Sequence, residues 1–193
     1  MTLRRAAAIL ALIAVAAVLA WVLFVGLPRW YGAPSATRAV AAAPSSSAPP
    51  PAGRKIKARL YYVNEDGTRL TAVERDVAYG EGTVEQARQI VEAQVAPVSE
   101  PLLSAIPPGT RVRSVFVTPT GEAYVDLSRE AAAAHAGGTL NEVLSIYTIV
   151  DALTENLPAV TAVQILVDGK EVDTLAGHVD LRVPLARNPA WVQ

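Results

Sequence analysis

The sequence contains no cysteine. This absence excludes disulfide bonds, thiol catalysis and metal sites built on cysteine. It also excludes the lipid anchor of bacterial lipoproteins, which is attached to an N-terminal cysteine. A chain without cysteine is compatible with an oxidising compartment but does not by itself identify one.

Histidine is scarce as well, and His135 and His178 are the only two in the chain. The sequence has no paired spacing typical of a metal site, no G-x-S-x-G nucleophile elbow and no P-loop. We therefore predict no catalytic residue, no cofactor-binding residue and no metal ligand.

One pair of residues still offers two interpretations. Asp126 and Ser128 stand two positions apart at the end of a strand-like segment. A hydrolase would use Ser128 as its nucleophile, and it would need a histidine within hydrogen-bond reach as the base. The alternative, which these residue types favour, is that Asp126 or Ser128 caps the turn that follows.

Acidic residues are absent from the first 53 residues, which hold Arg4, Arg5, Arg29 and Arg38. All 18 acidic residues lie in the remainder of the chain, so the two parts differ in the sign of their charge. Nucleic-acid binding needs a concentrated basic face, which an acidic domain lacks. We therefore expect no nucleic-acid partner.

Residues 6–27 contain no charged side chain. A helix of this length spans about 33 Å, enough to cross a hydrocarbon core of about 30 Å. Arg4 and Arg5 precede it, as the positive-inside rule requires for a cytoplasmic N-terminus. We predict a cytoplasmic segment at 1–5 and a transmembrane signal anchor in the lipid bilayer at 6–27. The alternative is cleavage of a signal peptide at the small residues Val40 to Ala43.

The anchor places the rest of the chain outside the cytoplasmic membrane, in the periplasm or extracytoplasmic space. Residues 28–56 are rich in proline, alanine and serine, a composition that cannot bury enough surface to fold. We predict an extended linker there. A folded domain is expected at 57–185, followed by a C-terminal tail at 186–193.

Alternating hydrophobicity and turn signals predict the strands of this domain. Asn64–Gly67 and Asp168–Gly169 are expected to form hairpin turns. Strands are expected at 57–63, 72–79, 111–117, 122–127, 160–167 and 170–175, and residues 176–185 are expected to form a final edge strand or an ordered arm.

Two helices interrupt the strands. The first should begin at Thr83 and the second at Thr139, each with a capping box that pairs the threonine with Gln86 or Glu142. Apolar residues recur at helical spacing after both starts, and a proline ends each helix. The predicted fold class is α+β: a mixed β-sheet covered on one face by two main helices, in the order β-β-α-β-β-α-β-β.

The connection from the first helix to the third strand contains the sequence "AIPPGT". Pro108 and Gly109 occupy the second and third positions of a type II turn, where proline fixes φ and glycine supplies a positive φ. Leu102, Leu103 and Ile106 are too apolar for a solvated loop. We expect this connection to pack down against the domain.

Three segments together resemble a known family. They are "LLSAIPPGTRVRSVFVTPTGEAYVDLS", "GGTLNEVLSIYTIVDALTENLPAVTAVQILVDGK" and "LAGHVDLRVPL". As an ordered set within residues 57–185, they resemble the GerMN domain, found in sporulation and spore germination proteins. The chain differs from a common form of the family in having a transmembrane segment instead of a lipid-attached cysteine, and in having one copy of the domain where the founding member has two.

The resemblance implies an α/β, non-enzymatic module of the cell envelope. In the family, the founding role is to assist assembly of a transenvelope complex during spore formation, and no catalytic residue set is associated with the domain. We therefore expect a membrane-tethered protein-interaction module whose partners are envelope proteins. The alternative is a module that binds peptidoglycan or another glycan, on which exposed tyrosines such as Tyr61 or Tyr124 could stack. Candidate partner-binding residues are Tyr124, Arg113, His178 and Arg182.

Overall fold

The computed structural model describes Trp21 and residues 53–193, and residues 53–193 belong to one compact unit. The predicted membrane helix lies outside the described residues, apart from Trp21. Most of the predicted linker lies outside them too. Within the described part of the chain, no helix is both long enough and apolar enough to cross a membrane.

The strands between residues 53 and 193 form two separate sheets, and not the single sheet that the sequence predicted. One is the antiparallel hairpin of β1 and β2. The other has five strands: β3 and β4 are antiparallel, β4 and β5 are parallel, and both β6 and β7 run antiparallel to β5. The strands are β1 (Lys55–Val63), β2 (Leu70–Ala78), β3 (Val112–Val117), β4 (Glu122–Leu127), β5 (Ala162–Val167), β6 (Lys170–Glu171) and β7 (Leu185–Ala186).

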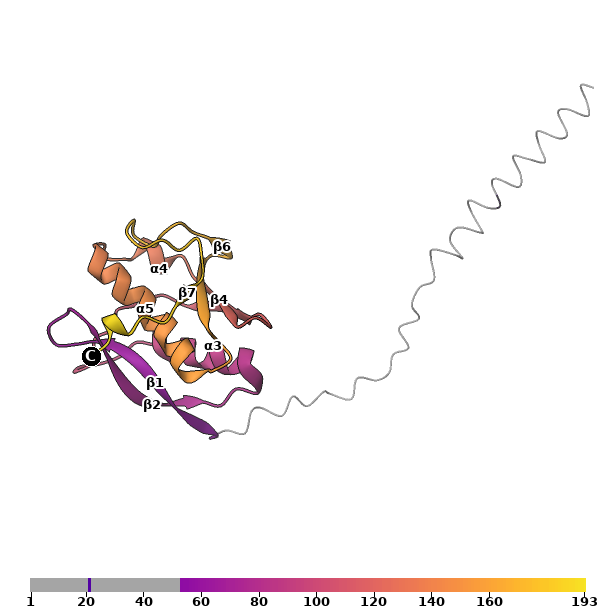
Figure 1. Ribbon diagram of the computed structural model, residues 1–193, viewed down its shortest axis with the longest axis horizontal. Helices are drawn as coiled ribbons and strands as arrows, with labels where there is room; N and C mark the ends of the chain where they lie inside the picture. The colour runs from indigo at the N-terminus through magenta and orange to yellow at the C-terminus, as the bar shows by residue number, and fades with distance from the viewer. Residues whose placement is uncertain (1–20, 22–52) are drawn as a thin grey trace, which may run out of the picture. The chain divides into compact units, whose positions relative to one another are not determined.

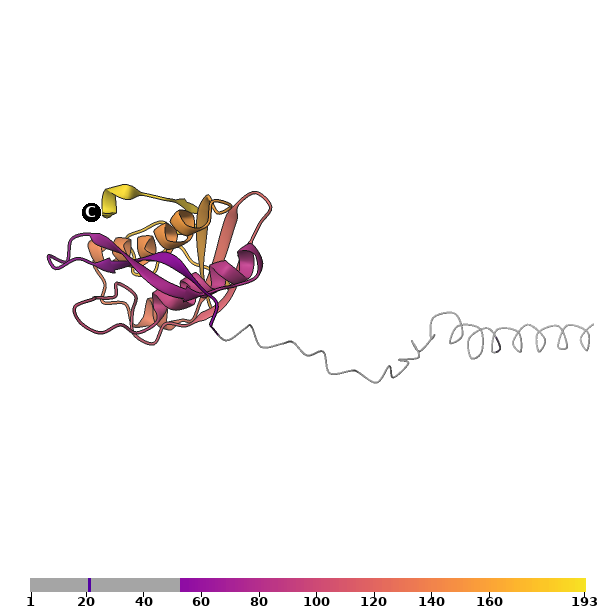
Figure 2. The same ribbon diagram turned by 90° about the horizontal axis from the view of Figure 1, so that it is seen from below.

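Two long helices join the sheets. Each of α3 and α5 contacts the other helix, the hairpin and the five-stranded sheet, and α5 runs alongside β1 in both ribbon views (Figures 1 and 2). The central core therefore belongs to both sheets. The helical segments are α3 (Gly82–Val95), α4 (Glu130–Ala133), α5 (Thr139–Asn156) and the short 3-10 helix η2 (Pro189–Trp191).

Side-chain amides close the outer edge of β1, which explains why the hairpin does not join the larger sheet. The amide of Gln94 on α3 donates to the carbonyl of Tyr61 and accepts from its N–H, both at 2.8 Å. The side-chain amide of Asn156 on α5 makes the same pair of bonds with Arg59: it accepts from the N–H at 2.9 Å and donates to the carbonyl at 2.8 Å. Because these backbone groups are already paired, another strand cannot hydrogen-bond there.

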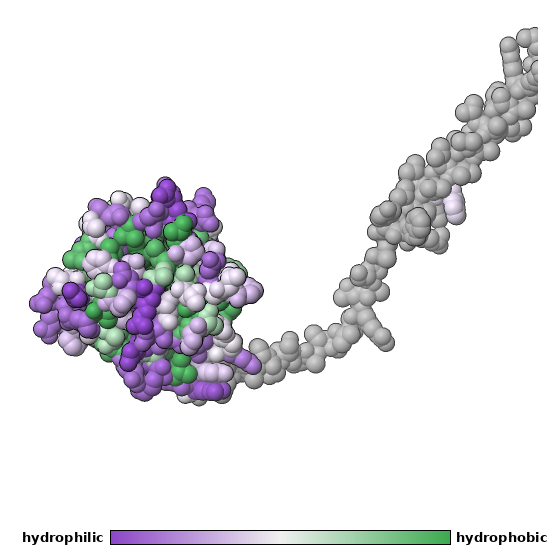
Figure 3. All heavy atoms as spheres, in the orientation of Figure 1, coloured by the Kyte–Doolittle hydropathy of each residue, from purple (hydrophilic) through white to green (hydrophobic). Residues whose placement is uncertain are grey.

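The five-stranded sheet has one dry face, as predicted. Ala123, Val125 and Leu127 on β4 are each at most 1% exposed, and Val163 and Ile165 on β5 lie beside them. Alternate residues of a strand point to opposite faces, so this pattern places the core on one side of the sheet. The surface of the domain is a mixture of hydrophilic residues and smaller hydrophobic patches (Figure 3).

Both predicted capping boxes are wrong, although the two helices begin within one residue of the predicted positions. The cap residue of α3 is Glu81, whose side chain makes no cap bond, and that of α5 is Gly138, which has no side chain to make one. Gln86 reaches back past the helix start, where it accepts a hydrogen bond from Gly80 N at 3.0 Å and donates to Ala78 O at 3.1 Å.

Glu142 has a different role from the predicted cap. Its carboxylate, fully buried, accepts hydrogen bonds from the backbone N–H groups of Leu175, Ala176 and His178 at 2.8–2.9 Å. Burial alone would raise the pKa of Glu142, but the N–H donors of Ala176, His178 and Leu175 outweigh it and hold the pKa below 4.5. Glu142 therefore anchors a distant segment of the chain onto α5.

That segment is a loop, which corrects the predicted strand at 170–175, whereas residues 176–185 mostly form the ordered arm that was the alternative to an edge strand. Only Lys170–Glu171 and Leu185–Ala186 pair with β5, and the residues between them leave the sheet and return to it. The side-chain amide of Gln164 on β5 donates to Leu181 O and holds the returning part. The interior of the loop is thus fixed by side chains and not by a strand ladder.

Candidate functional site

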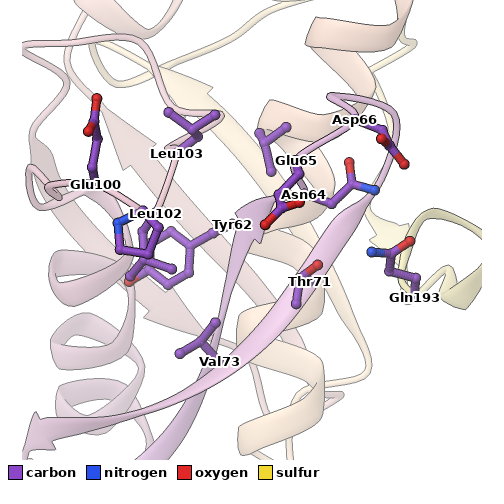
Figure 4. Close-up of a pocket in the computed structure, with 12 residues that line it drawn as sticks. Tyr62, Asn64, Glu65, Asp66, Thr71, Val73, Glu100, Leu102, Leu103 and Gln193 are labelled. Carbon is purple, nitrogen blue, oxygen red and sulfur yellow. The ribbon is translucent and has the colours of Figure 1, made fainter.

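A groove of about 690 Å³ opens between the loop that follows β1 and the connection from α3 to β3. Figure 4 shows Glu100, Leu102 and Leu103 on one side and the residues of the β1–β2 loop on the other. Tyr62 and Val73 come from the hairpin itself, and Gln193 comes from the end of the described chain.

Backbone and side-chain hydrogen bonds fix the two walls. Val63 N donates to Leu103 O at 2.8 Å, so the connection meets the end of β1 in an isolated antiparallel bridge. Asn64, which is 6% exposed, accepts from Thr68 N at 3.0 Å and from Arg69 N at 3.1 Å. An asparagine that bonds nearby backbone in this way sets the course of a loop. Both walls are therefore built into the fold.

The groove combines an apolar lining with acidic edges. Its apolar side chains include Leu103, which is 51% exposed, and the half-buried Leu102. The carboxylates of Glu65, Asp66 and Glu100 are exposed, and none of them forms a salt bridge within residues 53–193. The residues that line the groove include no lysine or arginine. An amphipathic ligand with positive charge matches this surface.

Sequence reasoning found only part of this site. Leu102 and Ile106 pack down as expected, since Leu102 is half-buried and Ile106 is 8% exposed. The type II turn is also confirmed: Thr110 N donates to Pro107 O at 3.3 Å and Gly109 has a φ of 84°. The exposure of Leu103 is different from the expectation. In the sequence, the two leucines follow Glu100 and Pro101 in a loop, and nothing there distinguishes them. Only the fold shows which of the two is exposed.

A smaller recess of about 290 Å³ contains a serine–histidine contact that sequence reasoning missed. The Nε2 atom of His135 lies 3.1 Å from the hydroxyl of Ser145. However, Nδ1 accepts a hydrogen bond from Gly137 N at 2.9 Å, so in the neutral ring the proton is on Nε2. The Ser145 hydroxyl donates to Ala105 O at 2.5 Å. A general base needs a free nitrogen facing the hydroxyl, and this pair presents a donor.

Asp126 and Ser128 also make structural bonds. Asp126 accepts a hydrogen bond from Gly169 N at 2.7 Å, in the turn between β5 and β6. Ser128 accepts from Arg111 N at 3.0 Å and so joins the start of β3 to the end of β4. The predicted cap is wrong, because α4 begins at Glu130 and its cap residue is Arg129, with no side-chain cap bond. Among the hydrogen bonds of the described residues, none links Ser128 to a histidine.

Two of the four candidate partner-binding residues are arginines, and both already bind carboxylates of the domain. Arg113 lies 2.7 Å from Asp168 and 3.5 Å from Asp126. Arg182 lies 2.7 Å from Asp180, and the hydrogen bonds from its side chain and its backbone N–H hold the pKa of that carboxyl at about 2. Neither arginine lines the groove.

The other two candidates also lie away from the groove. The ring of His178 is 3.1 Å from the Glu142 carboxylate. Tyr124 on β4 is half-buried and stands opposite Phe116 on β3, whose side chain is 61% exposed. None of the four candidates therefore contributes to the lining of the groove.

Three solved structures share the fold. A Clostridium perfringens protein that is named as a lipoprotein has a TM-score of 0.51 and 22% identity, over 70% of this chain and 89% of that one. The tandem GerMN domains of the sporulation protein GerM from Bacillus subtilis have a TM-score of 0.53 and 16% identity, over 69% of this chain and 46% of that one. The first GerMN domain of the same protein has a TM-score of 0.51 and 18% identity, over 68% of this chain and 98% of that one. Because all three identities are at or below 22%, these comparisons show a shared fold and nothing beyond it.

The sequence comparison covers a similar region. The family described as "Sporulation and spore germination" matches residues 59–173, which is more than half of the chain. Among curated proteins, none matches the sequence. The matched residues run from β1 to the loop after β6, so they include α3, α5 and the groove between Asn64 and Leu103. This chain belongs to the sporulation and spore germination family of GerMN-related domains.

Proposed function

We propose that this protein is a non-catalytic interaction module that residues 6–27 tether to the cytoplasmic membrane and that the linker preceding β1 holds away from it. The observation that carries the proposal is a contrast within the folded domain. The side chains suited to catalysis are engaged in holding the fold, whereas the acidic residues of the groove have no ion-pair partner within residues 53–193. The family is not a known enzyme family, which agrees with this contrast.

The physical argument against catalysis concerns proton transfer. A serine nucleophile must lose its proton to a nearby base. Ser128 accepts a backbone hydrogen bond, and the neutral His135 ring presents its proton to Ser145. His178 is paired with the Glu142 carboxylate. None of these groups is in the state that a nucleophile and its base require.

Crosslinking in living cells tests the interaction. A photoreactive amino acid would be placed at Leu103, at Phe116 and at Glu171 in separate variants, because all three side chains are exposed. We expect at least one of these positions to capture a defined envelope protein. Capture of no protein from any of the three positions would contradict the proposal.

A topology reporter tests the location. A reporter that is active only outside the cytoplasm, fused after Gln193, should be active if residues 6–27 anchor the chain with its N-terminus inside. A second reporter that is active only in the cytoplasm should be inactive at the same fusion point. The reverse pattern would overturn both the location and the envelope role.

One observation favours a second candidate function, glycan binding. Phe116 is 61% exposed and stands opposite the half-buried Tyr124, so two aromatic rings adjoin on the five-stranded sheet. Exposed aromatic rings of this kind can stack on sugars. If the domain binds cell wall, it should pellet with purified wall material, and Phe116→Ala should reduce the pelleted fraction. Absence of pelleting would remove this candidate.

A further inference from the structure

We infer that the groove binds an extended peptide segment in which apolar side chains alternate with lysine or arginine. The inference rests on the proposed interaction function and specifies its partner. The groove is the one lined by Tyr62, Val73, Leu102 and Leu103, with Glu65, Asp66 and Glu100 at its edges.

Charge complementarity selects a cationic partner. Glu65, Asp66 and Glu100 are exposed and form no salt bridge with another described residue, and the groove lining contains no lysine or arginine to offset them. Elsewhere in the domain some carboxylates are paired, as Asp76 is with Lys57 at 2.7 Å, and others, such as Glu171, form no salt bridge with a described residue. The three carboxylates therefore give the edges of the groove a net negative charge that favours a cationic partner. One cation, Arg75, reaches a lining residue, where it donates to the Tyr62 hydroxyl at 3.4 Å.

The apolar lining selects a peptide over a simple ion or polyamine. Leu103 is 51% exposed although its neighbour Leu102 is half-buried, and both line the groove. A leucine or valine of the partner would cover this surface and remove it from water. A bound metal ion is a poorer match, because no cluster of three metal-ligating side chains occurs among the described residues.

The walls favour an extended segment over a helix. The β1–β2 loop and the connection lie on opposite sides of the groove (Figure 4), and the connection pairs with Val63 as a single extended bridge at Leu103. A peptide in the β conformation presents side chains alternately to its two faces. One face would then bring apolar side chains to Leu102 and Leu103, and the other would bring cations to the acidic edges.

Fluorescence anisotropy tests the inference with the full chain in a zwitterionic detergent. The probe is a labelled synthetic peptide of alternating lysine and leucine. Two matched peptides replace all lysines by glutamate or all leucines by serine. We expect the probe to bind at least about tenfold more tightly than either matched peptide, and higher salt to weaken it.

Variants of the chain then locate the site. Because a single exposed ion pair is a small contribution, we expect Glu65→Gln or Glu100→Gln to weaken binding about threefold and the double variant about tenfold. Glu171→Gln, which removes an exposed carboxylate on β6, should leave binding unchanged. Equal binding of the probe by the double variant and the parent chain would overturn the inference, and so would an equal loss in Glu171→Gln.

The outcome separates this inference from the proposed function. If photocrosslinking captures an envelope protein at Phe116 but not at Leu103, and the probe does not bind the groove, then the interaction module stands and the groove inference fails. If no position captures a protein and the probe still binds, the site exists but the envelope role fails.

Discussion

The side-chain amide of Asn156 bonds both the N–H and the carbonyl of Arg59, although 97 positions separate them. Gln94 does the same to Tyr61. Two helices thus provide side-chain substitutes for a neighbouring strand, and this arrangement separates the hairpin from the larger sheet.

The amide contacts should contribute measurably to stability. Gln94→Ala leaves the N–H and the carbonyl of Tyr61 buried without partners, so we expect the free energy of unfolding to fall by about 2 kcal/mol. Urea denaturation followed by circular dichroism measures the loss. Gln89→Ala is the matched control on the same helix, because Gln89 bonds only the Glu85 side chain. An equal loss in the two variants would contradict the proposed role of Gln94.

Hydrogen exchange gives a second readout of the same contacts. The amide of Tyr61 should exchange faster in Gln94→Ala, and that of Arg59 should exchange faster in Asn156→Ala. Each variant should leave the other amide protected. Faster exchange throughout β1 in both variants would instead indicate general destabilisation of the hairpin.

Glu142 should be the most costly polar residue to remove from α5. Glu142→Ala leaves three backbone N–H groups of the 175–178 loop without an acceptor, and we expect a loss of about 3 kcal/mol. Glu142→Gln keeps one acceptor oxygen and should lose less. Glu171→Ala, at an exposed position, should change stability by less than about 0.5 kcal/mol.

The contribution of Glu142 to the stability of the domain should depend on pH. The pKa of Glu142 is lower in the folded state than its ordinary value of 4.5, so its contribution is present above pH 4.5 and is lost as the pH falls through the folded-state pKa. The stability difference between the parent chain and Glu142→Gln should therefore shrink between pH 5 and pH 3. A difference that stays constant over this range would refute the prediction.

The contribution of Asp151 to stability should change with pH in the opposite direction. Burial raises its pKa from 3.8 to about 6, although Asn188 N donates to one of its oxygens at 3.2 Å. A raised pKa means that the group is most favourable below 3.8 and that stability is lost as the pH rises to about 6. We expect Asp151→Asn to be more stable than the parent chain at pH 7.5, by up to about 3 kcal/mol, with no difference near pH 3.5. Denaturation curves at both values measure this.

Labelling with a fluorophosphonate probe tests the absence of a serine nucleophile. We expect no labelling of Ser128 or Ser145, because the neutral His135 ring presents its proton to Ser145 and Ser128 has no hydrogen bond to either histidine among the described residues. A known serine hydrolase in the same reaction is the positive control. Labelling of Ser145 that disappears in His135→Ala would show that the serine is activated.

Local patterns predicted most of the elements. Periodicity located both long helices within one residue at their starts, and the Asp168–Gly169 turn follows β5 as expected. Asp168 has a φ of 51°, which the turn demands and which aspartate tolerates. These features depend on neighbours in the sequence, so the sequence alone was sufficient.

Features that depend on distant partners were not predicted. The Thr139–Glu142 spacing matches a capping box, but the carboxylate gains three N–H donors from a loop more than thirty positions away. The single-sheet prediction failed for the same reason, because nothing near Arg59 indicates that Asn156 will occupy its edge. The groove is also a product of two distant segments, joined at Val63 and Leu103.

The Asn156 contact has a consequence for synthesis on the ribosome. Translation produces β1 and β2 first, while the residue that completes the Arg59 edge is made almost a hundred positions later. Until then the newborn hairpin offers an unpaired strand edge to other chains, which is the condition that favours aggregation. A truncated chain that ends before α5 should therefore be bound by chaperones, whereas a chain that extends past residue 156 can close its own edge.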